Sequence, residues 1–87
     1  MEFIAETVCR VCGLDVGEVR FDEAGCSLHV VCDCCGTESG YGDERVNQVR
    51  HLRRSWLDRG AQWHRPKSRP LTWDLQQQLA GIPPQWL

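Results

Sequence analysis

The sequence predicts a small α+β domain that is held together by a metal ion. Two cysteine turns would carry a short antiparallel β-hairpin, followed by one long and one short α-helix. Three observations predict this fold class: two C-x2-C-G pairs, a β-prone stretch between them, and proline-free helical patterns after them. The 87 residues suit a single domain. Its parts are a ribbon in 1–42, an amphipathic helix in 43–60, and a basic loop, short helix and Pro/Trp tail in 61–87.

The cysteine spacing is the strongest indication. The pairs are Cys9-Arg10-Val11-Cys12-Gly13 and Cys32-Asp33-Cys34-Cys35-Gly36, and nineteen residues separate Cys12 from Cys32. Two intervening residues allow a tight turn to aim both sulfurs at one point, and the glycine that follows can take the positive φ of such a turn. Four thiolates suit a tetrahedral Zn²⁺ with Zn–S distances of about 2.3 Å. We therefore predict a structural zinc site of the zinc-ribbon or rubredoxin-like kind, with Cys9, Cys12, Cys32 and Cys35 as ligands.

Two further cysteines leave the ligand set open. Cys34 lies between the ligands of the second turn, Cys26 lies six residues before Cys32, and either could replace a member of the set. As spare thiols they would serve as small apolar side chains. Three histidines are less favoured ligands, because nothing in the sequence places them near the turns: His29, His51 and His64.

Disulfide bonding of the six cysteines is the competing interpretation. Residues 1–6 show neither the basic nor the long apolar region of a secretion signal. We therefore expect a reducing, cytoplasmic setting, where C-x2-C pairs more often bind metal. No stretch approaches the length of an apolar membrane span.

The elements follow in order. Residues 3–8 suggest an extended lead-in, residues 16–22 and 27–31 have the pattern of two strands, and 23–25 the pattern of a turn. A helix is predicted over 44–59, with Asp43 as N-cap and Gly60 just after its end. Its apolar stripe should pack on the ribbon and consists of Val46, Val49, Leu52 and Trp56, with Leu57 at the edge.

The C-terminal part should contain one short helix. Residues 61–70 are irregular and basic, and Thr72 is the expected N-cap of a helix over 73–80 that stops at Gly81. Leu75 and Leu79 form its i, i+4 apolar pair. The prolines of the tail, residues 82–87, predict an extended rather than a helical segment.

Acidic and basic residues are concentrated in different parts of the chain. Residues 1–43 hold nine acidic and two basic side chains, whereas residues 44–70 hold eight basic and two acidic ones. A basic segment of this kind can meet nucleic acid or an acidic protein. The alternative is that the two halves neutralise each other across the fold.

Catalysis is not expected. Four thiolates leave no open metal position for water. The glutamate of the zinc-deaminase H-x-E motif is missing after every histidine. A nucleophilic pair such as Cys26 or Cys34 with His29 has only proximity in sequence to support it. No small-molecule substrate is predicted.

The sequence also resembles a group of short bacterial cysteine-rich proteins, the CPCC zinc-ribbon-like proteins. The group pattern runs roughly C-P-x-C-G, then C-x5-C-P-x-C-G-T-E-F-G-Y-D-D, then R-x-x-W-I-x-x-G-A-x-W-W, then P-P-x-x-W-D-x-x-x-Q-L. The matching stretches are 9–13, 26–43, 53–64 and 69–79. The chain departs from the pattern by lacking proline after Cys9 and Cys32, by Ser39 for phenylalanine and by His64 for tryptophan. The resemblance implies a bacterial origin and a bound zinc ion, but no reaction.

We therefore predict a non-enzymatic, zinc-stabilised protein-binding module of the immunity, inhibitor or accessory type. Trp56 and Trp73 are expected in the core, and Trp63 and Trp86 at an interface. The predicted patch for an acidic partner consists of Arg50, Arg53, Arg54, Trp63 and Arg65. A second interpretation is that these residues only tie the C-terminal half to the acidic half. A third is nucleic-acid binding through the basic residues of 45–69.

Overall fold

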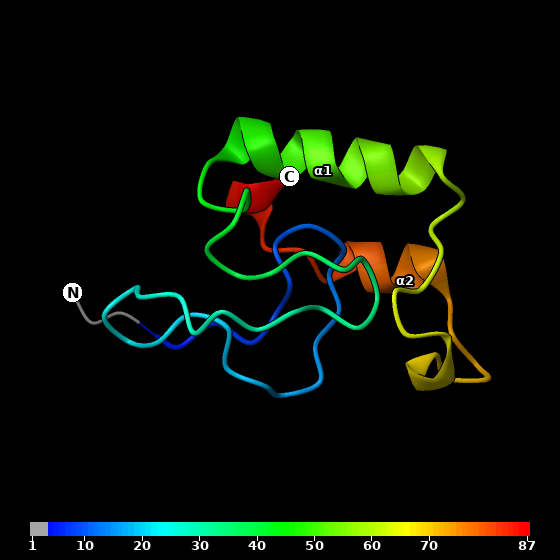
Figure 1. Ribbon diagram of the computed structural model, residues 1–87, viewed down its shortest axis with the longest axis horizontal. Helices are drawn as coiled ribbons and strands as arrows, with labels where there is room; N and C mark the ends of the chain where they lie inside the picture. Colours follow the sequence, from blue (N-terminus) through cyan, green and yellow to red (C-terminus); the bar gives the residue numbers. More distant parts are fainter. Residues whose placement is uncertain (1–3) are drawn as a thin grey trace.

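The computed structural model describes residues 4–87 and contains two α-helices, α1 (Val46–Asp58) and α2 (Leu75–Ala80) (Figure 1). Two single 3₁₀ turns accompany them, η1 (Pro66–Ser68) and η2 (Pro84–Trp86). The chain before α1 is irregular and winds along one side of that helix. Residues 1–3 lie outside the described part, so only residues 4–8 of the predicted lead-in can be placed.

The predicted β-hairpin does not form as a ladder. Between residues 4 and 87 the structure has no continuous strand, only isolated antiparallel bridges, one of which pairs Phe21 with Ser27. The expected turn is present, because the Asp22 N–H donates to the Cys26 carbonyl at 2.9 Å. Pairing does not extend beyond it, since Gly17 and His29 have positive φ (78° and 55°), which breaks an extended backbone. The helices and the cysteine turns thus match the prediction, and the hairpin does not.

The two cysteine turns share one backbone conformation. We call residues 9–13 the first knuckle and residues 32–36 the second knuckle. In each, the glycine N–H donates to the carbonyl of the first cysteine at 2.9 Å. The N–H of that cysteine donates to the residue after the glycine, at 2.8 Å in the first knuckle and 2.9 Å in the second. Gly13 and Gly36 have φ of 86° and 81°, as the C-x2-C-G pattern predicts.

The start of α1 differs from the prediction. Arg45 is the N-cap and makes no side-chain capping bond. The expected cap, Asp43, is instead fully buried, and its carboxylate accepts the Gly40 N–H at 2.8 Å. Its carbonyl oxygen accepts a hydrogen bond from Arg10 at 2.9 Å. Asp43 therefore anchors the segment that leads into α1 rather than the helix itself.

The end of α1 confirms the prediction. Gly60 has φ 88°, its N–H donates to Leu57 at 3.0 Å, and the Ala61 N–H donates to Trp56 at 2.9 Å. This pair of bonds is a Schellman motif, which the glycine makes possible. Of the predicted stripe, Val49 and Trp56 are fully buried.

The C-terminal elements need two corrections. The N-cap of α2 is Asp74, whose carboxylate accepts the Gln77 N–H at 3.0 Å, and not Thr72. The tail is not extended, because η2 forms with Pro84 in its first turn, where a missing N–H is tolerated. Leu75 and Leu79 both pack against the core, as their spacing predicts.

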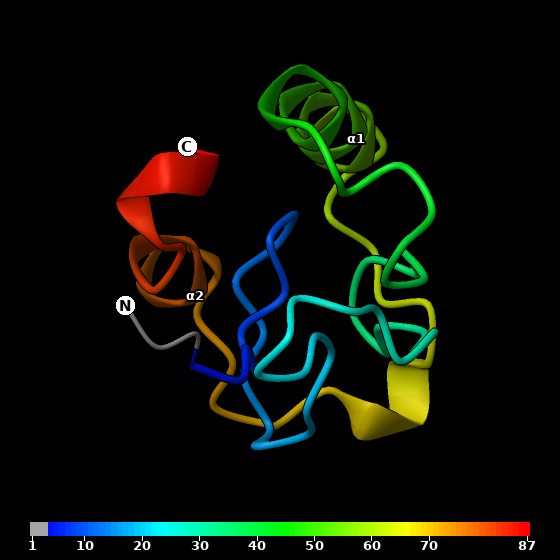
Figure 2. The same ribbon diagram turned by 90° about the vertical axis from the view of Figure 1, so that its left-hand side faces the viewer.

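The first knuckle lies between the two helices. Arg53 of α1 donates to the Val11 carbonyl at 2.7 Å, and Gln78 of α2 donates to the Cys12 carbonyl at 3.1 Å. Figure 2 shows the early part of the chain in this position, with α1 on one side and α2 and η2 on the other. At Gly13 the approach to α2 is so close that a β-carbon would meet the Gln78 carbonyl oxygen at 2.3 Å. The cysteines are thus placed at the centre of the molecule.

Candidate metal centre

Four cysteine sulfurs meet between the two knuckles. The Sγ atoms of Cys9 and Cys35 are 3.6 Å apart, those of Cys12 and Cys32 are also 3.6 Å apart, and all four lie within 4.8 Å of one another. Sulfurs at about 2.3 Å from a central tetrahedral ion would be separated by about 3.8 Å. Each close pair takes one sulfur from each knuckle, so an ion held here would join the two. These four cysteines could hold a metal ion.

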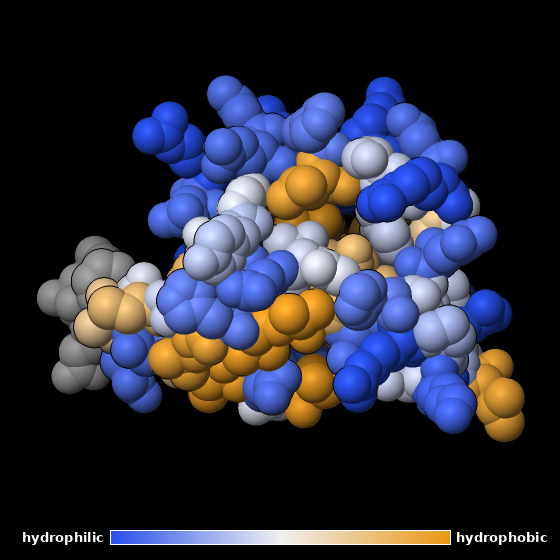
Figure 3. Space-filling model, in the orientation of Figure 1, coloured by the Kyte–Doolittle hydropathy of each residue, from blue (hydrophilic) through white to orange (hydrophobic). Residues whose placement is uncertain are grey.

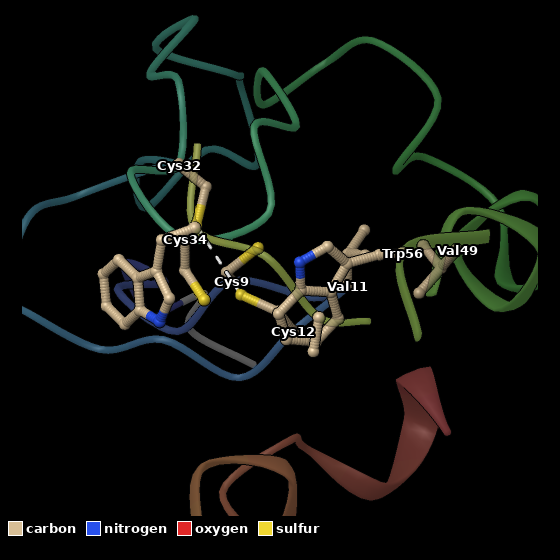
Figure 4. Packing of buried hydrophobic residues seen from close by; sticks show 9 residues of the cluster. Cys9, Val11, Cys12, Cys32, Cys34, Val49 and Trp56 are labelled. Atoms are coloured by element: carbon tan, nitrogen blue, oxygen red, sulfur yellow. Dashed lines mark hydrogen bonds between the residues drawn. The ribbon is translucent and has the colours of Figure 1, made fainter. Parts of the chain in front are cut away.

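The cluster is also the centre of the core. Cys9 and Cys12 are completely buried, Cys32 is 2% exposed, and Cys35 is half-buried. Figure 4 shows the side chains of Cys9, Cys12 and Cys32 converging, with Val11 and Trp56 next to them and Val49 farther out on α1. Buried sulfurs with no room for water around most of them favour a structural rather than a reactive ion.

Hydrogen bonding among the thiols shifts their acidity in opposite directions. The pKa of Cys9 is lowered, mainly because its sulfur is hydrogen-bonded by Cys12 and Cys32. The pKa of Cys12 is raised, mainly by its hydrogen bonds with Cys32 and Cys34. The thiols of the cluster thus differ in acidity, and Cys9 gives up its proton more readily than Cys12. A divalent cation bound here would displace the remaining protons and offset about half of the charge of four thiolates.

The two spare cysteines do not enter the set. Cys26 is exposed, whereas the other five cysteines are buried or half-buried. Cys34 is completely buried, and its sulfur accepts a hydrogen bond from Gln78 Nε2 at 3.3 Å. Within residues 4–87 no histidine joins the four sulfurs at metal-binding distance. The C-x2-C-G spacing therefore selected the cysteines that lie together.

Sequence reasoning missed Arg10, which lies inside the first knuckle. Its guanidinium carbon is 3.6 Å from the centroid of the Phe21 ring and 4.0 Å from that of Trp86. It also donates two hydrogen bonds to the Glu6 carboxylate, at 2.9 and 2.7 Å. Arg10 is only 8% exposed, and its position between two predicted metal ligands gave no indication of this burial.

Gln78 was missed as well. Its Nε2 donates to the Cys12 carbonyl and to Cys34 Sγ, so one side chain of α2 reaches both knuckles. Its Oε1 accepts the indole N–H of Trp73 at 2.7 Å. The only hint was its position beside the Leu75 and Leu79 pair, because a run of three glutamines does not show which one faces inward.

The predicted partner patch is not one surface. Trp63 is 8% exposed and packs edge-on against Trp73, with ring centroids 5.6 Å apart, so its prediction as an exposed anchor is wrong. Arg53 also does not face outward, as a member of the predicted patch would. Its guanidinium turns inward and donates to the carbonyls of Arg10, Val11 and Trp86 at 2.6–2.9 Å.

The other members of the patch remain at the surface. Arg54 is exposed, and Arg50 is exposed with its Nε donating to the Leu87 carbonyl at 2.6 Å. Arg65 is exposed and lies 3.9 Å from the Asp33 carboxylate. Trp56 and Trp73 pack in or on the core as predicted, while Trp86 is half-buried against Arg10. The inward contacts support the interpretation that part of the basic segment ties the two halves together.

Comparison of the chain with protein families, with curated proteins and with solved structures found no match. None of the helices in residues 4–87 is long and apolar enough to cross a membrane.

Proposed function

We propose that this chain is a zinc-stabilised, zinc-ribbon-like module that acts by binding another protein and has no catalytic role. The observation that carries the proposal is the closed set of four sulfurs from two matching knuckles. Because the set already fills four tetrahedral positions, an ion there would have no site for substrate or water. Its contribution would be to hold the knuckles together.

Zinc is the metal that we assign to this site. Four thiolates are soft ligands that select zinc, copper(I) or iron over magnesium and calcium. Zinc needs no redox partner and suits the reducing, cytoplasmic setting expected from the sequence. Iron bound by the same ligands would colour the protein, so the absorption spectrum of the purified protein, together with its metal content, distinguishes the two.

The partner is proposed to be acidic and to meet the outer face of α1. Figure 3 shows hydrophilic side chains along this side of the molecule. Arg50 and Arg54 lie one helical turn apart there, and both are exposed. The CPCC-like resemblance implies a bacterial origin, and we propose a partner in the same bacterium, as for an immunity, inhibitor or accessory protein.

Capture from an extract of the native host tests this proposal. We expect Arg54→Glu to lose the captured partner and Lys67→Glu, an equal charge change on η1, to keep it. Both residues are exposed, so both variants should remain folded. Equal capture by the two variants would show that α1 is not the contact face.

Nucleic acid is the second candidate, and one observation favours it. Of the eight basic residues in 45–69, Arg65 alone has a side-chain carboxylate of residues 4–87 within 4.0 Å, although Arg50 and Arg53 donate to main-chain oxygens. Unpaired arginines can bind phosphates, and such binding weakens steeply between about 50 and 200 mM salt. Gel-shift measurements with single- and double-stranded DNA and RNA at low salt decide the matter, since absence of a shift removes this candidate.

A further inference from the structure

One ligand of the proposed metal centre reaches the surface. The Sγ-bearing side chains of Cys9, Cys12 and Cys32 are 0–2% exposed, whereas Cys35 is half-buried. Cys35 lines two neighbouring cavities, of about 190 and 600 Å³. Of the four proposed ligands, Cys35 is therefore the one that a small molecule in these cavities can approach most closely.

Both cavities share two further residues, Arg59 and His64. Arg59 follows α1, and its Nε donates to the Ser55 carbonyl at 3.2 Å, which fixes the side chain along the end of the helix. The His64 N–H donates to the Cys34 carbonyl at 2.9 Å. Its ring packs against the second knuckle, where a β-carbon on Gly36 would lie 3.1 Å from His64 Nδ1. The approach to Cys35 is thus walled by a cation and an imidazole.

Arg59 gives the smaller cavity a positive charge, which favours an anion there. No carboxylate lines the smaller cavity, and Glu38, which lines the larger one, lies 3.6 Å from His29 Nδ1. The Cys35 thiol donates a hydrogen bond to the Thr37 hydroxyl oxygen at 3.3 Å, so a polar group also lies next to the sulfur. An electrophile that carries carboxylates would be attracted by Arg59 and would meet the sulfur directly.

We propose that Cys35 is a modification site of the metal centre, reacting with small anionic disulfides. The Cys35 thiolate attacks one sulfur of the disulfide R–S–S–R. A new S–S bond joins Cys35 to one RS group, the original S–S bond breaks, and the other half leaves as RS⁻. The disulfide is the oxidant, so no other reactant is required. Capping Cys35 removes one of four ligands and weakens the hold on the ion. This inference rests on the proposed metal site.

The test uses the zinc-loaded Cys26→Ser protein, because exposed Cys26 would otherwise react first. The probes are two disulfides of similar size and opposite charge, dithiodiglycolate and cystamine. Mass spectrometry of peptides locates each adduct, and a zinc-binding dye follows release of the metal. We expect dithiodiglycolate to modify Cys35 about tenfold faster than Cys9, Cys12 or Cys32, which need local opening of the fold. Zinc release should follow at the same rate.

Arg59→Gln tests the role of charge, with Arg54→Gln as the matched control elsewhere on α1. The anionic-to-cationic rate ratio at Cys35 should fall by roughly threefold or more in Arg59→Gln and stay unchanged in Arg54→Gln. Equal modification of all four cysteines in protein that carries zinc overturns the inference and leaves the metal site intact. A ratio that responds equally to both arginine variants overturns the anionic specificity. Protein purified without zinc instead contradicts the proposed function, whatever its thiol reactivity.

Discussion

Arg10 shows how a charged residue can occupy the interior of a small protein. Its planar guanidinium fits between the rings of Phe21 and Trp86, while its N–H groups are used by Glu6 and by the Asp43 carbonyl. A lysine could not do both, because its ammonium is compact and lacks the flat, forked donor set. Since Arg10 lies between Cys9 and Cys12, these contacts also fix the first knuckle.

Loss of this side chain should destabilise the protein strongly. We expect Arg10→Ala to lower the free energy of unfolding by about 2–4 kcal/mol, because it leaves a gap between two rings and a partly buried carboxylate without its partner. Arg10→Lys should restore only part of the loss. Arg54→Ala, at an exposed site, should change stability by no more than about 0.5 kcal/mol. Urea unfolding of the zinc-loaded proteins measures all three, and equal effects of Arg10→Ala and Arg54→Ala would contradict this account.

Asp43 should make stability depend on pH. Its pKa is raised from 3.8, mainly by burial, which the Gly40 N–H and Arg10 only partly oppose. A raised folded-state pKa means that the folded chain binds the proton more tightly, so this stabilisation is present below pH 3.8 and is lost as pH rises through the folded-state pKa. Asp43→Asn cannot ionise, so its stability relative to the wild type should increase as pH rises. Urea unfolding of both proteins across this pH range measures the difference, in which the pH dependence of metal binding cancels. A difference that falls with rising pH would be inconsistent with a raised pKa.

The position of a single residue could be predicted from the sequence where it depends on contacts with neighbours along the chain. The C-x2-C-G spacing identifies the cysteines that meet, because each turn is closed by bonds within five residues. Arg10, Asp43 and Trp63 were not predictable in the same way, because their burial depends on partners far along the chain. Phe21 and Trp86 enclose Arg10, and Trp73 packs against Trp63.

At the scale of elements, α2 is attached to the knuckles through Gln78. A six-residue helix is too short to be stable alone, so its packing determines whether it forms. Gln78 supplies hydrogen bonds to Cys12 and Cys34, and Leu75 and Leu79 supply apolar contact. The neighbouring Gln76 is exposed.

The run of three glutamines offers a matched pair of variants. Gln78→Ala should lower the free energy of unfolding by about 1–3 kcal/mol, because it leaves the Cys12 carbonyl and the Trp73 indole N–H without partners. Gln76→Ala should have almost no effect or a slightly stabilising one, since alanine is the better helix former. Thermal unfolding monitored by circular dichroism compares the two. A Gln76→Ala variant as unstable as Gln78→Ala would mean that helix propensity, not the contact with the knuckles, is what holds α2.

The elements were predicted to different degrees for physical reasons. The long helix was placed well because it has an amphipathic period and a C-terminal glycine, although its N-cap was missed when Asp43 took a tertiary role. The hairpin was predicted from alternating residues, but left-handed backbone at Gly17 and His29 limits pairing to single bridges. A 3₁₀ turn at Pro84 was missed because proline is excluded from helix interiors but not from a first turn.

On the scale of the whole molecule, three of the four proposed ligands lie in the core, and Cys35 packs against it. Cys9, Cys12 and Cys32, together with the spare Cys34, occupy its centre, with Val11, Val49, Ala61 and two tryptophans around them. So few aliphatic side chains in a chain of 87 residues make an apolar core marginal without a further constraint. A bound ion would supply that constraint by joining the knuckles, and α1 and α2 both dock on the first of these.

We propose above all that a zinc ion held by Cys9, Cys12, Cys32 and Cys35 sustains this fold. The most direct measurement is the metal content of protein purified without chelator, combined with circular dichroism after the metal is removed. We predict close to one zinc ion per chain, loss of zinc in Cys9→Ser but not in Cys26→Ser or Cys34→Ser, and loss of the α1 signal on chelation. A metal-free protein that stays folded, or a Cys34→Ser protein that loses zinc while Cys9→Ser keeps it, would contradict the claim.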